Sequence, residues 1–183
     1  VLVTVAPAAT GVVNDQLEAI GDGQAIKSVT VMPAVAGTLA SVDIQSGAKV
    51  EAGTIVARLD NSSETIAVNS AKLALSSAEE KVARYKGLQS VTRVERDGAQ
   101  GTVDEAKLAL ETAELKWKRR ISTAPIGGIA GIVAVNPGDN VTTQTQIVAL
   151  DDRSEILVDF WVPERFANAI AVGAPVDASA ISQ

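Results

Sequence analysis

The most regular pattern in the chain lies between residues 62 and 120, where apolar positions recur at alternating intervals of three and four. The first series is Val68, Ala71, Leu75, Ala78, Val82 and Tyr85, and the second is Ala99, Val103, Ala106, Leu110, Ala113 and Trp117. This spacing is typical of a coiled-coil seam on an α-helix. Two such series joined by a short connection predict a long antiparallel helical hairpin.

Polar residues mark where each of these helices begins. Asn61 followed by Glu64, and Thr92 followed by Glu95, match the capping-box pattern, in which two side chains satisfy the first free N–H groups of a helix. The second box places the tip of the hairpin near residues 88–91. Helices of about 26 residues each would be about 39 Å long.

The segments on either side of the hairpin are related to each other in sequence. Residues 34–61 align without a gap on residues 125–152, at a constant offset of 91. The identical pairs are Gly37/Gly128, Val42/Val133, Gly47/Gly138, Val50/Val141, Thr54/Thr145, Leu59/Leu150 and Asp60/Asp151. Because the matches fall at glycines and at alternating apolar positions, where backbone geometry dictates the residue, they indicate a structural repeat.

Each copy of the repeat has the pattern of short strands joined by tight turns. Alternating apolar residues, such as Val42 and Ile44, predict strands with one buried face. Residues 136–139, Asn-Pro-Gly-Asp, fit a type II turn, and Ser46 and Gly47 form the corresponding turn of the first copy. Neither copy is long enough to close a core alone, so we expect two half-sheets that face each other and bury both apolar faces.

The two ends of the chain also have strand character. We expect strands at Val1–Val5, Ser28–Met32, Ile156–Val162 and Gly173–Val176, with a short helix around Phe166–Ile170. These segments suggest a further β domain, of which only a part is present.

The composition excludes several classes of protein. With 16 basic and 22 acidic residues the net charge is −6, and only five side chains are aromatic. This balance lacks the basic surface and the stacking platforms of a nucleic-acid-binding protein. Cysteine and histidine are both absent, so neither a thiolate zinc site nor a Ser-His-Asp triad can form. Two of the side chains that most often act as catalytic bases, nucleophiles and metal ligands are missing, and we expect no catalysis, cofactor or metal.

The order of half-motif, helical hairpin, half-motif and a strand ending in Val-Pro-Glu resembles a known family. It is similar to the periplasmic adaptor (membrane fusion) proteins of tripartite efflux pumps, particularly those that serve RND-type transporters. The segments that carry the resemblance are 37–60, 121–128 (Ile-Ser-Thr-Ala-Pro-Ile-Gly-Gly), 136–141 (Asn-Pro-Gly-Asp-Asn-Val) and 158–164 (Val-Asp-Phe-Trp-Val-Pro-Glu). The resemblance covers nearly the whole chain.

The resemblance implies a mixed β plus α fold. In this family the two half-motifs form a lipoyl-like barrel-sandwich hybrid, which is interrupted by an α-helical hairpin and flanked by a small β-barrel. The chain then divides into residues 1–27 (β-barrel strands and lead-in), 28–61 and 121–152 (the two halves of the lipoyl-like domain), 62–120 (the hairpin) and 153–183 (a further part of the β-barrel domain).

The resemblance also implies a mechanical, non-catalytic function. The chain would belong to a periplasmic adaptor that bridges an inner-membrane RND transporter and an outer-membrane TolC-like channel, and that associates with copies of itself in a ring. The chain has no apolar run of 18 residues that could span a membrane. The resemblance therefore implies anchoring to the inner membrane by an N-terminal segment that this sequence lacks.

The family resemblance marks candidate docking residues at the hairpin tip. Members that dock on a TolC-like channel tend to carry an Arg, a Leu four residues later, and a Ser at the start of the second helix. Arg84 and Leu88 match the first two, and Thr92 takes the place of the Ser with a shorter connection. The resemblance thus assigns partner docking to Arg84, Leu88 and Thr92.

Two other functions remain open from the sequence. An adaptor of an ABC-type exporter or of a type I secretion system would have the same architecture. A lipoyl or biotinyl carrier domain would present a lysine at an exposed turn, because the cofactor is attached through its amine. The equivalent turn, after Asp60, continues as Asn-Ser-Ser-Glu into a predicted helix and has no lysine.

Overall fold

The structure, a computed structural model, describes residues 18–88 and 90–179 of the chain. The described residues divide into two compact units, one within residues 25–156 and a smaller one of residues 18–24 and 157–179. The larger unit contains both copies of the sequence repeat and the segment between them.

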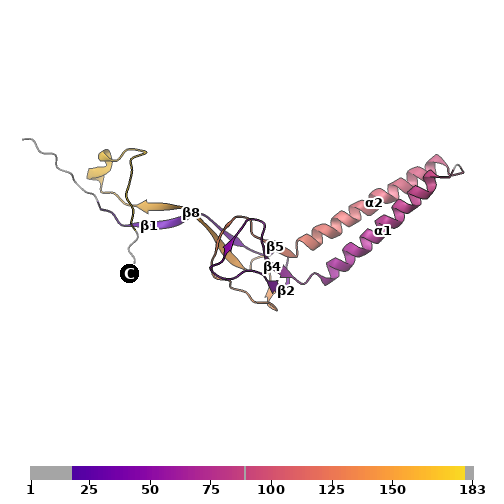
Figure 1. The fold of residues 1–183 in the computed structure, drawn as a ribbon, viewed down its shortest axis with the longest axis horizontal. Coiled ribbons are helices and arrows are strands. Elements are labelled where there is room, and N and C mark those ends of the chain that lie inside the picture. The colour runs from indigo at the N-terminus through magenta and orange to yellow at the C-terminus, as the bar shows by residue number, and fades with distance from the viewer. Residues whose placement is uncertain (1–17, 89, 180–183) are drawn as a thin grey trace, which may run out of the picture. The chain divides into compact units, whose positions relative to one another are not determined.

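In the described part of the chain, the strands form two four-stranded sheets (Figure 1). The strands are β1 (Gly21–Val31), β2 (Gly37–Val42), β3 (Lys49–Val50), β4 (Ile55–Leu59), β5 (Ile121–Thr123), β6 (Gly128–Ala130), β7 (Asn140–Val141) and β8 (Val148–Phe160). Their order is β1-β8-β6-β3 in one sheet and β5-β4-β2-β7 in the other. Each sheet therefore combines strands from both copies of the repeat.

The two copies pair with each other in the same way in both sheets. β2 pairs with β7 so that Gly37 lies opposite Val141, and β6 pairs with β3 so that Gly128 lies opposite Val50. The offset of 91 that relates Gly37 to Gly128 also relates Val50 to Val141. Exchanging the copies leaves the pairing unchanged, as an approximate twofold axis requires, and this confirms the predicted repeat.

The turns obey the same symmetry. In the segments 45–48 and 136–139 the fourth N–H donates to the first carbonyl at 3.1 Å, which confirms both predicted turns. Their glycines, Gly47 and Gly138, have φ values of +80° and +96°, a region that residues with a Cβ avoid. The N–H of each glycine donates to a carbonyl of the other copy at 2.8 Å.

Most of the core of the larger unit is built from matched pairs of residues. These pairs are Leu39 and Ala130, Val50 and Val141, Val56 and Ile147, Ala57 and Val148, and Leu59 and Leu150. No member of a pair is more than 5% exposed. Fully burying one Val, Ile or Leu side chain contributes about 1.5–3 kcal/mol. The apolar faces that neither copy covers alone therefore hold the two copies together.

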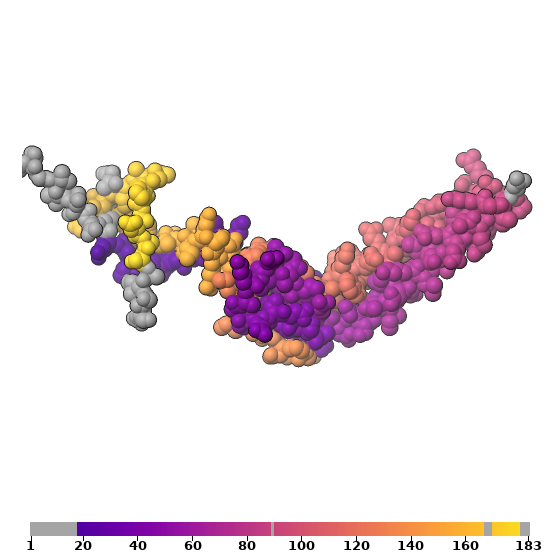
Figure 2. Space-filling view, in the orientation of Figure 1, coloured from indigo at the N-terminus to yellow at the C-terminus, as the bar shows by residue number. Residues whose placement is uncertain are grey.

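The segment between the copies is a helical hairpin made of α1 (Ser62–Lys86) and α2 (Arg93–Lys118). The two helices pack against each other along their length (Figures 1 and 2). All twelve predicted seam residues are buried or half-buried, whereas the other residues of both helices are exposed, except Glu64 and Glu114. The predicted hairpin and its seam are confirmed. In the described residues, neither of these helices nor any other has an apolar stretch long enough to cross a membrane.

The smaller unit contains the outer ends of two long strands. β1 begins at Gly21, earlier than the predicted start at Ser28, and β8 ends at Phe160. A 3-10 helix, η1 (Glu164–Ala169), occupies the place of the predicted short helix. The predicted strand at Val1–Val5 lies outside the described residues.

The predicted strand at Gly173–Val176 is wrong. Gly173 has a φ of +88°, and the Ala174 N–H donates to the Ala171 carbonyl at 3.0 Å, so a turn occupies this segment. Pro175 also has no N–H to offer to a neighbouring strand. The apolar residues of the segment gave the appearance of a strand, but the backbone is set by Gly173 and Pro175.

Candidate docking site on the helical hairpin

The hairpin turns between Lys86 and Arg93, where the sequence predicted its tip. Thr92 caps α2: its Oγ1 accepts the Glu95 N–H at 3.3 Å, while Glu95 Oε2 accepts the Thr92 N–H at 2.8 Å. This is the predicted capping box, and it fixes the path by which the chain enters α2. The hydrogen bonds from the backbone and hydroxyl of Thr92 hold the pKa of Glu95 below its ordinary value.

Two of the predicted docking residues present free surface at the tip. Arg84 lies in the last turn of α1 with its side chain 66% exposed, and its Nη1 is 3.7 Å from Glu80 Oε2. An ion pair of this length and exposure contributes little, so the guanidinium can turn to a partner. Leu88 follows the end of α1 and is 49% exposed. Thr92 differs, because its hydroxyl donates to Glu95 Oε2 at 2.8 Å and is engaged in the cap.

A shallow groove lies between the two helices close to the tip. Its volume is about 210 Å³, and it is lined by Val82, Tyr85, Lys86, Arg96, Asp97 and Gln100. Arg96 Nη2 donates to the Val91 carbonyl at 2.9 Å, which ties the connection to α2. The tip thus combines cations, an exposed leucine and a shallow groove, features that suit contact with another protein.

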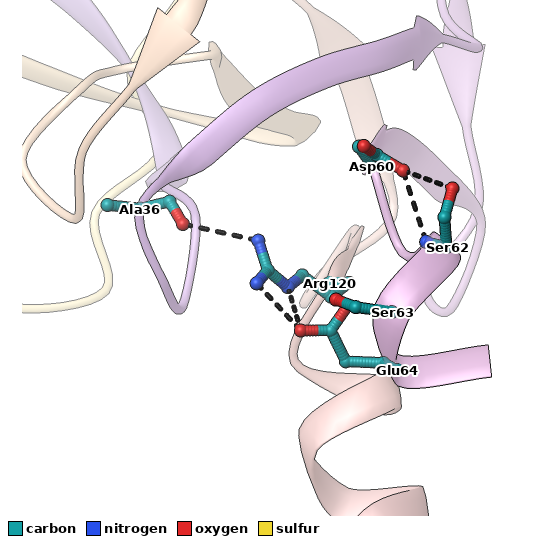
Figure 3. Close-up of polar contacts among 6 residues, drawn as sticks. All are labelled: Ala36, Asp60, Ser62, Ser63, Glu64 and Arg120. Carbon is teal, nitrogen blue, oxygen red and sulfur yellow. Dashed lines mark hydrogen bonds and ion pairs between the residues drawn. The ribbon is translucent and has the colours of Figure 1, made fainter. Parts of the chain in front are cut away.

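The other end of the hairpin is joined to the sandwich by Arg120, the second residue after α2 (Figure 3). Its Nε and Nη2 donate to Glu64 Oε1 at 3.0 and 2.7 Å, and its Nη1 donates to the Ala36 carbonyl at 3.3 Å. Glu64 lies in the first turn of α1, and Ala36 directly precedes β2. One guanidinium therefore connects both ends of the hairpin to the sandwich.

The capping box predicted at Asn61 and Glu64 is wrong. Asn61 makes no capping hydrogen bond with its side chain, and the Glu64 carboxylate is engaged by Arg120 instead. Asp60 takes over at this helix start, because its Oδ1 accepts the Ser62 hydroxyl at 2.6 Å and the Ser62 N–H at 3.1 Å. The same two hydrogen bonds hold the pKa of Asp60 below its ordinary value.

The charge of Glu64 results from opposing effects. Burial raises the pKa of Glu64, whereas hydrogen bonds from Arg120, from its own N–H and from the Ser63 hydroxyl, together with the Arg120 charge, lower it. The lowering effects are larger in sum, so the pKa of Glu64 lies below its ordinary value. The carboxylate is charged at neutral pH, and the ion pair with Arg120 is complete.

The cluster around Arg120 was not predicted from the sequence. Glu64 and Arg120 flank the two seam series, and Trp117 Nε1 donates to Thr65 Oγ1 at 3.2 Å across the same end of the hairpin. The seam alignment could have placed Glu64 near Arg120. Charged residues at helix ends are, however, common on solvated surfaces. The sequence pattern alone therefore did not distinguish a partly buried ion pair from two separate solvated charges.

The arrangement offers contacts rather than reactive groups. In residues 18–88 and 90–179 no group of three or more acidic side chains is placed to hold a metal ion. The hairpin presents positive charge, exposed apolar surface and hydrogen-bonding groups at its tip, and a partly buried ion pair at its base. These groups can bind and orient another protein.

Curated proteins resemble the chain over most of its length, although no family model matches it. The multidrug resistance protein MdtA of Klebsiella pneumoniae subsp. pneumoniae is 34% identical over 169 residues, which cover 81% of this chain and 40% of that protein. An uncharacterized protein of Haemophilus influenzae is 33% identical over 147 residues, covering 79% and 38%. The chain spans about two fifths of the length of these relatives.

Solved structures share its fold. A MacA-MexA chimeric protein that contains the α-hairpin domain of Pseudomonas aeruginosa MexA matches with a TM-score of 0.72 and 25% identity, over 81% of this chain and 55% of the chimera. The membrane fusion protein Spr0693 of Streptococcus pneumoniae has the same fold, with a TM-score of 0.61 and 17% identity over 85% and 74% of the two chains. The predicted fold class, a mixed β plus α sandwich of two half-motifs interrupted by a hairpin, is confirmed. The sequence similarity to MdtA and the shared fold identify this chain as a protein of the membrane fusion (adaptor) type.

Proposed function

We propose that this chain is part of a non-catalytic adaptor that bridges an inner-membrane RND-type transporter and an outer-membrane TolC-like channel in a tripartite efflux pump. The observation that carries the proposal is the hairpin, a two-helix arm with an exposed tip that is anchored at its base to a sandwich with the membrane fusion protein fold. Such an arm can connect two partners without any chemistry of its own.

The proposal includes the assembly around this arm. The adaptor is periplasmic and anchored to the inner membrane, and its copies associate in a ring. Residues 1–27 and 153–183 belong to a flanking β-barrel domain, and residues 28–61 and 121–152 form the lipoyl-like domain around the hairpin of residues 62–120. The name of MdtA, a multidrug resistance protein, supports efflux as the process.

The structure bears differently on the two alternative functions, a carrier domain and an adaptor of another type of exporter. A carrier domain is disfavoured, because β4 ends at Leu59 and α1 begins at Ser62, so a helix occupies the place of the turn that would present a modified lysine. An adaptor of an ABC-type exporter or type I secretion system has the same hairpin and sandwich. Cross-linking the adaptor to its transporter in the source bacterium, followed by mass spectrometry, separates these cases: an ATPase partner would contradict the RND proposal.

The tip residues Arg84, Leu88 and Thr92 dock on the channel in this proposal. Arg84 supplies a charge-assisted hydrogen bond, and Leu88 supplies an apolar contact. Thr92 acts mainly by holding the start of α2 in place, because its hydroxyl is engaged by Glu95. Docking is repeated in each copy of the ring, so a small loss per contact is multiplied by multivalency.

Substitution of Arg84 tests the docking site. Arg84→Asp should abolish adaptor-dependent drug resistance in cells. It should leave the protein level and the melting temperature unchanged, because the exposed 3.7 Å pair with Glu80 contributes little to stability. Lys72→Asp, on the exposed shaft of α1, is the matched control and should retain resistance. Full resistance in Arg84→Asp cells with a normal protein level would reject Arg84 as a docking residue.

A further inference from the structure

Three separate segments of the larger unit meet at the Arg120 guanidinium. They are the first turn of α1, the residues that follow α2, and the segment that leads into β2. The side chains of Arg120 and Glu64 are only 24% and 15% exposed. An Arg that binds one carboxylate oxygen through two nitrogens and a carbonyl through a third is held in a defined orientation, because its fork of donors is planar and rigid.

Room for this guanidinium is provided by Gly37. A Cβ at Gly37 would lie 2.7 Å from Arg120 Nη1, a distance too short for a real contact. Gly37 directly follows Ala36, whose carbonyl accepts from Arg120. Because Gly37 has no side chain, the guanidinium can pass close to the backbone at this point. The glycine and the ion pair both fit the guanidinium to one place at the base of the hairpin.

The second copy of the repeat has no such cluster. The offset of 91 relates Glu64 to Glu155 and Arg120 to Val29. Valine cannot pair with a carboxylate, and Glu155 is exposed. The matching place in the second copy is therefore built without such an ion pair, and the cluster is specific to the place where the hairpin leaves the sheet.

The length of the hairpin makes the angle at its base important. α1 has 25 residues, so it is about 38 Å long at 1.5 Å per residue, and a rotation of about 10° at the base moves its end by about 7 Å. A displacement of this size exceeds the tolerance of a hydrogen bond or a close apolar contact.

We propose that Arg120 is a positioning residue that fixes the direction of the hairpin relative to the sandwich, by joining Glu64 to the Ala36 carbonyl in the space left by Gly37. The consequence for docking rests on the proposed function: with the base fixed, every hairpin in an assembly presents its tip at the same place. The direction of the hairpin itself is a property of the protein alone and can be measured without any partner.

Distances between spin labels test the proposal on the full-length protein in the absence of partners. One label is attached through Ala83→Cys, near the end of α1, and the other through Thr143→Cys, on an exposed residue of the sandwich. The unaltered base should give one narrow distance distribution. Arg120→Leu and Glu64→Gln should both broaden it by several ångströms, the displacement expected from rotations of about 10°.

Two further variants separate positioning from simple stabilisation. Gly37→Ala leaves both charged partners in place but displaces the guanidinium, so it should also broaden the distribution. Arg119→Leu removes the neighbouring exposed arginine and should leave the distribution unchanged. If Arg120→Leu is poorly folded, the isosteric Glu64→Gln and Gly37→Ala carry the test. A distribution that stays narrow in Glu64→Gln and Gly37→Ala overturns the proposal, even if stability falls.

Resistance assays on the same variants keep the two proposals apart. A broadened distribution with loss of resistance supports both the positioning role and the docking function. A broadened distribution with full resistance retains Arg120 as a positioning residue but contradicts the statement that docking needs a fixed hairpin. Loss of resistance with a narrow distribution overturns the positioning role and leaves the docking function standing.

Discussion

The two copies of the repeat have the same backbone pairing but different surroundings where the chain leaves them. The first copy continues from Asp60 into α1, and the second continues from the matching Asp151 along β8. At the first exit a glutamate and an arginine form a partly buried ion pair, whereas Glu155 and Val29 occupy the matching positions at the second. The comparison shows that the sandwich geometry is set by the shared core and turns, and that side chains added to one copy adapt it to hold the hairpin.

The matching glycines show the same difference in detail. A Cβ at Gly128 would lie 2.5 Å from the Asp151 carbonyl oxygen, a backbone atom. A Cβ at Gly37 would instead lie 2.7 Å from the end of the Arg120 side chain, and the nearest atom of Leu59 is 3.6 Å away. The glycine of the second copy is required by strand pairing, and the glycine of the first copy is required by the anchor of the hairpin.

The largest expected effect comes from the shared core and should be equal in the two copies. Leu59 and Leu150 are 1% and 0% exposed at matching positions. Leu59→Ala and Leu150→Ala should each lower the free energy of unfolding by about 2–5 kcal/mol, through lost burial and the cavity left behind. Chemical denaturation measures both. A large loss in one variant and a small loss in the other would show that the two copies do not contribute equally to the core.

Much of this architecture follows from local patterns. The seam of the hairpin was predictable because spacings of three and four residues belong to one helical face, and Leu75 and Leu110 need no knowledge of the rest of the chain. The repeat was predictable because Gly47 and Gly138 sit at turns that only glycine fits well. The capping box at Thr92 was predictable because both partners lie within one turn.

The parts that could not be predicted depend on contacts between distant residues. Glu64 matched a capping pattern with Asn61, but Arg120, 56 residues away, competes for its carboxylate and prevails. The role of Arg120 depends on where the Ala36 carbonyl points, which only the folded sandwich determines. The docking roles of Arg84 and Leu88 remain predictions, because an exposed side chain at a tip has the same environment whether or not a partner exists.

Alanine at the matching glycines should give unequal effects. Gly128→Ala must displace the Asp151 backbone, so we expect a loss of about 1–3 kcal/mol, typical of overpacking. Gly37→Ala can be relieved by movement of the Arg120 side chain, at the cost of one hydrogen bond, or about 0.5–1.5 kcal/mol. Denaturation curves of the two variants check this order, and a larger loss for Gly37→Ala would show that the sandwich needs this glycine for its own pairing.

The turn glycines should again behave alike. Gly47 and Gly138 have positive φ, and no atom would lie within 4 Å of an added Cβ. Gly47→Ala and Gly138→Ala should therefore each cost about 1–2 kcal/mol, through backbone strain alone. Gly101→Ala in α2 is the control, because the space is equally open and the backbone is helical; it should stabilise the helix by about 1 kcal/mol. Destabilisation by Gly101→Ala would mean that steric contact, not strain, dominates at open glycines.

The smallest expected effect distinguishes the two exits by their response to acid. The pKa of Glu64 lies below its ordinary value, despite burial, because of its hydrogen bonds to Arg120 and the charge of that residue. A lowered carboxyl pKa in the folded state means that the ion pair stabilises the protein at a pH above the pKa of an unfolded glutamate, about 4.3. This stabilisation is lost as the pH falls through the lower pKa of the folded state.

We expect Glu64→Gln to lower the free energy of unfolding by on the order of 1 kcal/mol at neutral pH, and this difference from the parent protein to decrease in acid. Glu155→Gln, at the matching exposed position, should give no difference at either pH. Unfolding free energies of the three proteins between pH 7 and pH 3 measure this. A difference for Glu64→Gln that stays constant over the whole range would show that Arg120 acts there through packing and not through charge.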